Sequence, residues 1–227
     1  MTRRPLSRRA SEGFTRILWR SKARNAARLR AWACAEEGSR IDLMLAANAC
    51  PDPDRAAAYL RHAHDEARHT RMFAARARAL AAEAGRPPPP PVHADTDDLY
   101  RRLGEAGFLA FVADGEARAL VGFRRTAAAL ADADPRTAAT LRALIPDEAH
   151  HAAYTRALLH QTGAGPGALR RVRAWSLWRG WLRLGRRLTR PLFLALFAAL
   201  APLLALSALW ARAARPARSG WQPPEAP

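Results

Sequence analysis

Two short segments of nearly identical sequence contain the residues of this chain that are best suited to bind a metal or to catalyse a reaction. Residues 65–69 read Asp-Glu-Ala-Arg-His, and residues 147–151 read Asp-Glu-Ala-His-His. In each segment a glutamate precedes a histidine by three positions, a spacing that places both side chains on one face of an α-helix. One such pair arises easily by chance, but two copies in a helix-rich chain predict a shared site.

Each copy follows a segment of helical periodicity that contributes its own inward glutamate. Glu116 is the only charged residue on the apolar face of its segment. Earlier in the chain, Glu36 and Glu37 compete for the equivalent position. The face through Glu36 is the more apolar one, with residues such as Leu29 and Leu43 on it. The sequence therefore predicts Glu36 as the inward residue, with Glu37 as the alternative.

These residues form a candidate set of metal ligands. Four carboxylates and two imidazoles in one helical core are costly unless cations compensate them, and two divalent cations would neutralise four carboxylates. Carboxylate oxygen with imidazole nitrogen suits iron or manganese better than a closed zinc site. We expect two iron ions, because open positions between two irons can take O₂, with manganese as the alternative. The expected ligands are Glu36, Glu66, His69, Glu116, Glu148 and His151.

Glu66 and Glu148 are expected to bridge the two metals. Glu36 with His69 would complete one metal, and Glu116 with His151 the other. Asp65 and Asp147 precede the bridging glutamates, and an aspartate there can accept the second ring proton of a ligand histidine. The alternative for both is an ordinary solvated helix acid.

Other polar residues near the motifs have a less specific signal. His62 lies one turn before Glu66 and could line an access path, although a single histidine on a packed face is more often structural. His150 is expected to face outward. Tyr59 and Tyr154 are expected to pack in the core rather than to carry a radical.

Four helices must position these side chains. The first should end at Pro51 and Pro53, and the second should start at a cap formed by Asp54. Asp134 followed by a proline is a cap for the fourth helix, in which Pro146 predicts a kink. The expected ranges are 22–49, 54–84, 97–132 and 135–161.

Gly85 and Arg86 are followed by five prolines. Such a run cannot be helical and should form a stiff, extended crossover between the second and third helices.

This arrangement resembles the ferritin-like di-iron carboxylate superfamily, in which two helices each provide a Glu and two others each provide Glu-x-x-His. The resemblance covers about 36–160. It implies an all-α fold, a ferritin-like four-helix bundle with a long crossover, and activation of O₂ or peroxide with electrons from an external donor. The sequence of residues 65–69 is similar to the corresponding motif of monooxygenase and desaturase subunits. The spacing is similar to that of small hydroxylases acting on demethoxyubiquinone or on modified tRNA adenosine.

The two ends of the chain are strongly basic. The 227 residues carry a formal charge of +17, and Lys22 is the only lysine. Arginines crowd the first 30 residues and 170–190, whereas acids concentrate in 36–148, a pattern that favours an anionic surface as partner. A GC-rich genome could also account for part of the arginine excess. The expected organisation is a basic segment 1–20, the bundle 21–162, and the segments 168–190, 191–211 and a disordered tail 212–227.

The segment 168–190 interleaves arginines with tryptophans, as interfacial helices do, and 191–211 contains no charged residue. Its length is sufficient to cross a bilayer core, so we expect a membrane-associated or transmembrane helix. A fifth helix on the bundle or a homodimer contact is the alternative. Arginines before this run would keep the bundle on the cytoplasmic side of a bacterial inner membrane.

Cys34 and Cys50 lie on one expected helix, too far apart for a disulfide, which indicates a reducing compartment. The N-terminus has no apolar stretch of the kind found in secretory signals.

The sequence predicts a membrane-associated di-iron oxidoreductase that hydroxylates or oxidises a lipid-like or quinone-like substrate. The alternatives are a rubrerythrin- or ferritin-like protein that oxidises iron or removes peroxide, a tRNA-modifying hydroxylase, and a metal-stabilised scaffold without catalysis. An uncharged apolar run fits poorly with the tRNA alternative.

Overall fold

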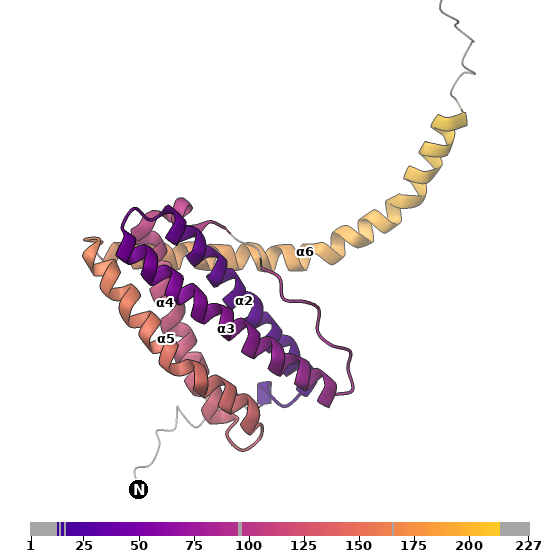
Figure 1. Ribbon diagram of the computed structural model, residues 1–227. Coiled ribbons are helices and arrows are strands. Elements are labelled where there is room, and N and C mark those ends of the chain that lie inside the picture. Colours follow the sequence, from indigo (N-terminus) through magenta and orange to yellow (C-terminus); the bar gives the residue numbers. More distant parts are fainter. Residues whose placement is uncertain (1–12, 14, 16, 95–96, 165, 214–227) are drawn as a thin grey trace, which may run out of the picture. The chain divides into compact units, whose positions relative to one another are not determined.

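The computed structural model describes residues 13, 15, 17–94, 97–164 and 166–213 (Figure 1). The described residues are helical with no β-strand, which confirms the all-α prediction. Most of the expected segments 1–20 and 212–227 lies outside these residues. The helices are α2 (Lys22–Ala49), α3 (Pro53–Glu83), α4 (Leu99–Ala129), α5 (Pro135–Gln161) and α6 (Pro166–Ala213).

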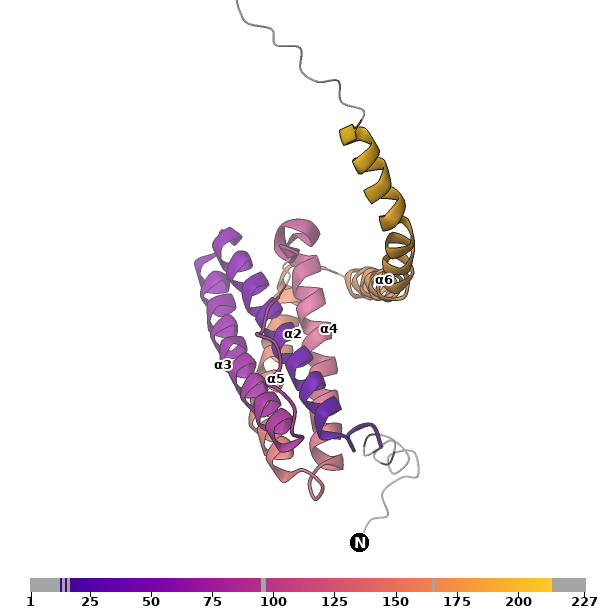
Figure 2. The same cartoon turned by 90° about the vertical axis from the view of Figure 1, so that its right-hand side faces the viewer.

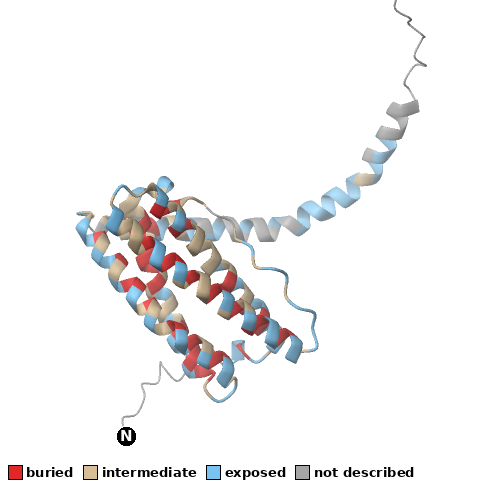
Figure 3. Ribbon diagram, in the orientation of Figure 1, coloured by how far each residue is buried: buried red, intermediate tan, exposed pale blue. Residues whose placement is uncertain are grey.

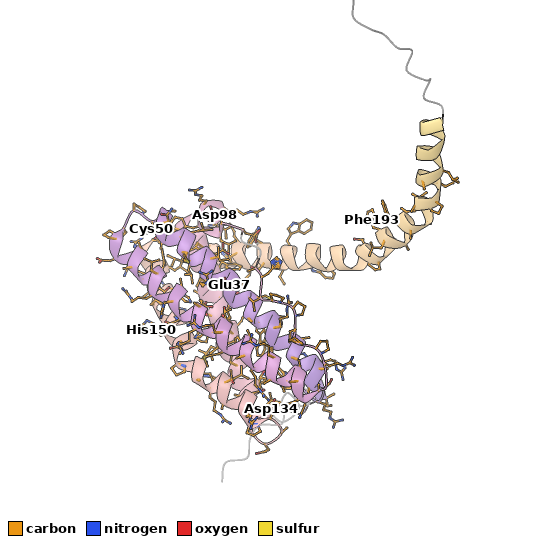
Figure 4. All side chains as sticks on the ribbon, turned by 45° about the vertical axis from the view of Figure 1, so that its right-hand side comes forward. Glu37, Cys50, Asp98, Asp134, His150 and Phe193 are labelled. Carbon is orange, nitrogen blue, oxygen red and sulfur yellow. The ribbon has the colours of Figure 1, made fainter. Side chains whose placement is uncertain are left out.

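Helices α2 to α5 form a four-helix bundle (Figures 1 and 2). Helix α2 packs along α3 and α4 along α5, and further contacts join α2 to α4 and α3 to α5. Lys22 at the start of α2 lies 3.1 Å from Glu83 at the end of α3, so these two helices are antiparallel. Cys50 and Asp98 lie near one end of the bundle and Asp134 near the other (Figure 4). Helices α3 and α4 therefore run in the same direction, and the chain between them must return along the bundle.

That return is the predicted proline-rich crossover. It runs along the outside of the bundle as irregular chain (Figure 1). The guanidinium of Arg30 on α2 donates from Nε to the carbonyl of Pro90 at 2.8 Å and from a terminal nitrogen to that of Pro91 at 2.9 Å. Val92 packs against the hydrophobic core. The crossover is thus held on the bundle despite having few backbone donors of its own.

Local sequence explains most helix ends. The expected cap of α3 was wrong by two residues, because Asp52 rather than Asp54 accepts from the backbone N–H groups at the helix start. Pro53 then occupies the first helical position, where a missing N–H has no cost. The same combination of a capping aspartate and a proline, predicted for α5, is confirmed with Asp134.

Helix α4 is shorter than expected and is irregular near its start. Gly104 has φ 67° and ψ 168°, a left-handed conformation that favours glycine, and helical geometry resumes after it. In α5, where a kink was expected at Pro146, the chain stays helical through that residue.

The core has aromatic layers on both sides of the level where the two motifs lie. Stretches of buried residues recur along each of the helices α2 to α5 (Figure 3). Trp32, Phe73 and Phe123 contact one another with ring centroids 5.3–5.5 Å apart. Tyr59 packs edge-on against Phe108 on the other side of the motifs. Trp19, from the basic N-terminal segment, packs on Trp32 and is buried.

The C-terminal region is one helix, α6, rather than the two expected. Its first turns belong to the bundle's compact unit, which extends to Arg173. Ala168 and Val172 are buried, and Arg173 Nε lies 2.8 Å from the buried Asp114. The compact unit that contains the bundle therefore extends beyond residue 162, because apolar and ionic contacts add the first turns of α6 to it.

From Ala174 onward the chain is a separate unit. Large apolar side chains on this part of α6 are exposed, Phe193 among them (Figure 4). No helix in the described part of the chain has the length and apolar character needed to cross a membrane, so the crossing expected at 191–211 is not found.

Candidate metal centre

Seven side chains from four helices bring possible ligand atoms together inside the bundle. They form two groups, and in each group the ligand atoms lie within 4.8 Å of one another. We name the groups by their histidine content. The one-histidine group is Glu36, Glu66, His69 and Glu148. The two-histidine group is His62, Glu66, Glu116 and His151.

All six expected ligands are present in these groups, and Glu66 belongs to both. Helix α3 presents its members at positions 62, 66 and 69, which share one helical face. Six of the seven side chains in the two groups are buried, and the seventh, Glu36, is half-buried. Glu37 is in neither group, and its carboxylate accepts two hydrogen bonds from Arg40 at 2.6 and 2.9 Å. The structure thus places Glu36 rather than Glu37 in the cluster.

The two aspartates beside the motifs contact the histidines crosswise. His69 Nε2 lies 3.2 Å from Asp147 Oδ2, and His151 Nε2 lies 3.3 Å from Asp65 Oδ2. Each aspartate therefore supports the histidine of the other motif rather than its own. Arg68 joins the two aspartates, with one terminal nitrogen 2.6 Å from Asp147 and 3.4 Å from Asp65.

This pairing leaves the inward nitrogen of each histidine unused. The Nδ1 atoms of His69 and His151 are buried and have no hydrogen-bond partner in the described part of the chain, and neither have Glu66 Oε2 and both carboxylate oxygens of Glu148. His69 Nδ1 lies 3.1 Å from Glu148 Oε1, but the two are not aligned as a hydrogen bond. Buried polar atoms without a hydrogen-bond partner are rare in folded proteins. Carboxylate oxygens and imidazole nitrogens fit a metal ion, so the cluster could hold one or more.

Burial sets the protonation of the cluster in the absence of cations. Burial raises the pKa of Glu66 to about 8, and burial together with Glu66 raises the pKa of Glu36 well above its usual range. Burial likewise raises the pKa of Glu116. Burial lowers the pKa of His62 to about 3. Metal binding must then displace carboxyl protons, whereas this imidazole is already in the neutral form that binds metals.

Glu148 behaves differently from the other three glutamates. Its burial favours the protonated form, but His69, together with Glu116 and His151, outweighs this and lowers the pKa of the carboxyl. The same contact with Glu148 raises the pKa of His69 despite its burial. The cluster thus contains one ion pair and three carboxyls that favour the protonated form.

His62 is the residue that sequence reasoning did not assign. Its Nε2 lies 3.0 Å from Glu66 Oε1 and 3.4 Å from Glu116 Oε1. Its Nδ1 lies 2.7 Å from the hydroxyl of Tyr154, and its ring stacks on His151 at 3.6 Å between centroids. The available signal was its place on the inward face four residues before Glu66.

A pocket of ≈ 380 Å³ lies at the two-histidine group between α3 and α5. His150, which is exposed as predicted, lies at its edge (Figure 4). Tyr154 borders it as well, so this tyrosine connects the pocket to His62 rather than only packing in the core. The lining residues are Ala58, Arg61, His62, Asp65, His150, His151, Tyr154, Ala157 and Leu158.

Comparison with known proteins does not assign a family to this chain. No protein-family model matches it, and neither a curated protein nor a solved structure does. The functional interpretation therefore depends on the geometry of the cluster.

Proposed function

We propose that this protein is a ferritin-like di-iron oxidoreductase that uses O₂ or peroxide to hydroxylate or oxidise a lipid-like or quinone-like substrate. The observation that carries the proposal is the convergence of buried carboxylates and imidazoles whose inward atoms have no partner. A core that buries such groups without cations would have a large desolvation cost.

The ligand types favour iron over zinc. The cluster contains oxygen and nitrogen donors, whereas Cys34 and Cys50 are outside both groups. Structural zinc sites favour thiolates, and mixed carboxylate and imidazole sites suit iron, with manganese as the alternative. Two ions fit because the ligand atoms form two groups that share Glu66.

Residues of the cluster have distinct roles in this proposal. Glu66 and Glu148 would be shared by the two ions, Glu36 with His69 would hold one ion, and Glu116 with His151 would hold the other. When bound, the irons supply redox chemistry with O₂ or peroxide, with electrons from an external donor. Asp147 and Asp65 accept the Nε2 protons of the histidines and so keep each Nδ1 available. The aromatic layers on either side exclude water from this level.

The pocket between α3 and α5 supports a reaction on an organic molecule rather than on iron alone. Its volume falls within the range of about 300–1,000 Å³ typical of small-molecule sites. Ala58, Ala157 and Leu158 give it apolar walls, and two cluster histidines form part of its lining. A molecule in this pocket would lie next to the metal pair.

The part of α6 from Ala174 onward supports association with an anionic membrane surface. Exposed tryptophan and leucine side chains accompany an arginine-rich sequence, the combination found in interfacial helices. The formal charge of +17 favours the same partner. We therefore propose that the protein works at the cytoplasmic face of a bacterial inner membrane, where greasy substrates partition.

Anaerobic loading with Fe²⁺, followed by metal analysis and optical spectra on exposure to O₂, tests the metal centre. We expect two irons per chain and their loss in Glu148→Ala, because that variant removes a bridging carboxylate. Glu37→Ala is the matched control, since the neighbouring acid lies outside the cluster. A chain that binds only zinc, or no metal, would refute the proposal.

The substrate class needs a second experiment. Comparison of the lipids and quinones of a deletion strain with those of the parent should show accumulation of one unoxidised compound. Iron oxidation or peroxide removal with no change in these compounds would assign the protein to the rubrerythrin- or ferritin-like alternative.

A further inference from the structure

We propose that His62 is a seventh protein ligand, which makes the two metal positions chemically unequal. This inference rests on the proposed metal centre and extends it. Six ligands in two equivalent sets would follow from the repeated motif alone, but the structure adds a third imidazole on one side only.

The position of His62 is that of a ligand. Its side chain is fully buried, and its Nε2 is directed at the carboxylates of Glu66 and Glu116 at 3.0 and 3.4 Å. Its ring lies parallel to that of His151, with 27° between the planes. Two neutral imidazoles in this arrangement can bind the same cation.

The other ring nitrogen of His62 has the partner that a ligand histidine needs. If Nε2 binds a metal, the ring proton must be on Nδ1, and the Tyr154 hydroxyl lies 2.7 Å away to accept it. Tyr154 would then accept the outer ring proton of His62, as Asp65 accepts that of His151. Each of the three cluster histidines thus has an outer hydrogen-bond partner that fixes its tautomer.

No equivalent ligand exists in the other motif. The residue four positions before Glu148 is Leu144, which is buried in the hydrophobic core. The one-histidine group therefore has three carboxylates and one imidazole, and the two-histidine group has two carboxylates and two imidazoles. Sharing Glu148 would add one carboxylate to the second group, which would still have one imidazole more than the first. Imidazole favours iron, cobalt and zinc, whereas carboxylate suits manganese. The two-histidine position should bind Fe²⁺ or Co²⁺ first and discriminate against Mn²⁺.

The same position faces the pocket. His62 and His151 line it, whereas Glu36, His69 and Glu148 do not. The nitrogen-rich metal position is therefore the one that an incoming molecule meets.

Anaerobic titration of the metal-free protein with Co²⁺, followed by calorimetry and metal analysis, tests this assignment. We expect two ions per chain in the wild type. His62→Ala should retain one tightly bound ion and bind the other at least about 100-fold more weakly, because losing a ligand exceeds the effect of losing an outer partner. Tyr154→Phe should weaken the same position by about 10–100-fold. In mixed Fe²⁺ and Mn²⁺, the wild type should hold one of each.

His64→Ala is the matched control, because His64 lies on the same helix but is exposed. It should bind both ions as the wild type does. His62→Gln, of similar volume, decides the question if His62→Ala fails to fold, as judged by circular dichroism of the metal-free protein. Wild-type binding of both ions by a folded His62 variant would overturn the inference while leaving the metal centre intact. Absence of metal from the wild type would instead refute the proposed function itself.

Discussion

The metal-free protein should lose stability when the pH rises from about 6.5 to about 8. Burial raises the pKa of Glu66 from its usual value of 4.5 to about 8. In this window the unfolded chain has already released that proton, whereas the folded chain retains it. Each pH unit therefore lowers the free energy of unfolding by about 1.4 kcal/mol, or about 2 kcal/mol over the window, from Glu66 alone.

Other groups of the cluster either add to this loss or oppose it only weakly in this range. Glu36 and Glu116, whose pKa values are also raised, add to the loss. His62 and His151, whose pKa values burial lowers to about 3 and about 4, oppose it mainly below about pH 6.5. Between pH 6.5 and 8 the unfolded imidazoles lose their remaining half proton, which offsets about 0.4 kcal/mol for each histidine. This opposing effect is smaller than the loss from Glu66 alone.

Urea unfolding of the metal-stripped protein at the two pH values, followed by circular dichroism, measures this loss. Glu66→Gln has no proton to release, so its dependence on pH should be smaller by about 2 kcal/mol. The metal-loaded protein should show the opposite trend, because cations compete with protons for the same carboxylates. A metal-free protein that is equally stable or more stable at the higher pH would refute the reasoning.

Three further predictions concern separate parts of the molecule. Asp147→Asn should weaken the metal held by His69 by about 10–100-fold, and Asp65→Asn should affect the other metal, as titration of each variant would show. Phe73→Ala should cost about 3–5 kcal/mol in urea unfolding, because its fully buried ring contacts two aromatic neighbours. Removal of 174–227 should preserve folding and metal content but abolish sedimentation with anionic vesicles; retained sedimentation would locate membrane binding elsewhere.

The sequence predicted six members of the buried cluster because their signal was repeated. Glu66 and Glu148 begin copies of one motif, and helical spacing then determines which face is inward. The choice of Glu36 over Glu37 followed from the apolar neighbours of the first, and the pairing of Glu37 with Arg40 agrees with it. Repetition and periodicity are local properties, so they can be read without a structure.

Features that depend on how two helices meet could not be predicted in this way. His62 has no counterpart in the second motif, so the repeat gave it no support. The crosswise contacts of Asp65 and Asp147 require α3 and α5 to be neighbours. The continuity of α6 was missed because composition changes at Pro191, although the helix continues through that proline. Membrane association and the substrate stay predictions.

The crosswise contacts also fix how far α3 can move along α5. Each imidazole is oriented by an acid on the opposite helix, and Arg68 spans both acids. Sliding one helix by a single turn, about 5.4 Å, would remove both acids from their imidazoles at once. The geometry of the buried cluster and the alignment of these two helices therefore depend on each other, and one half of the repeated motif cannot shift without displacing the other.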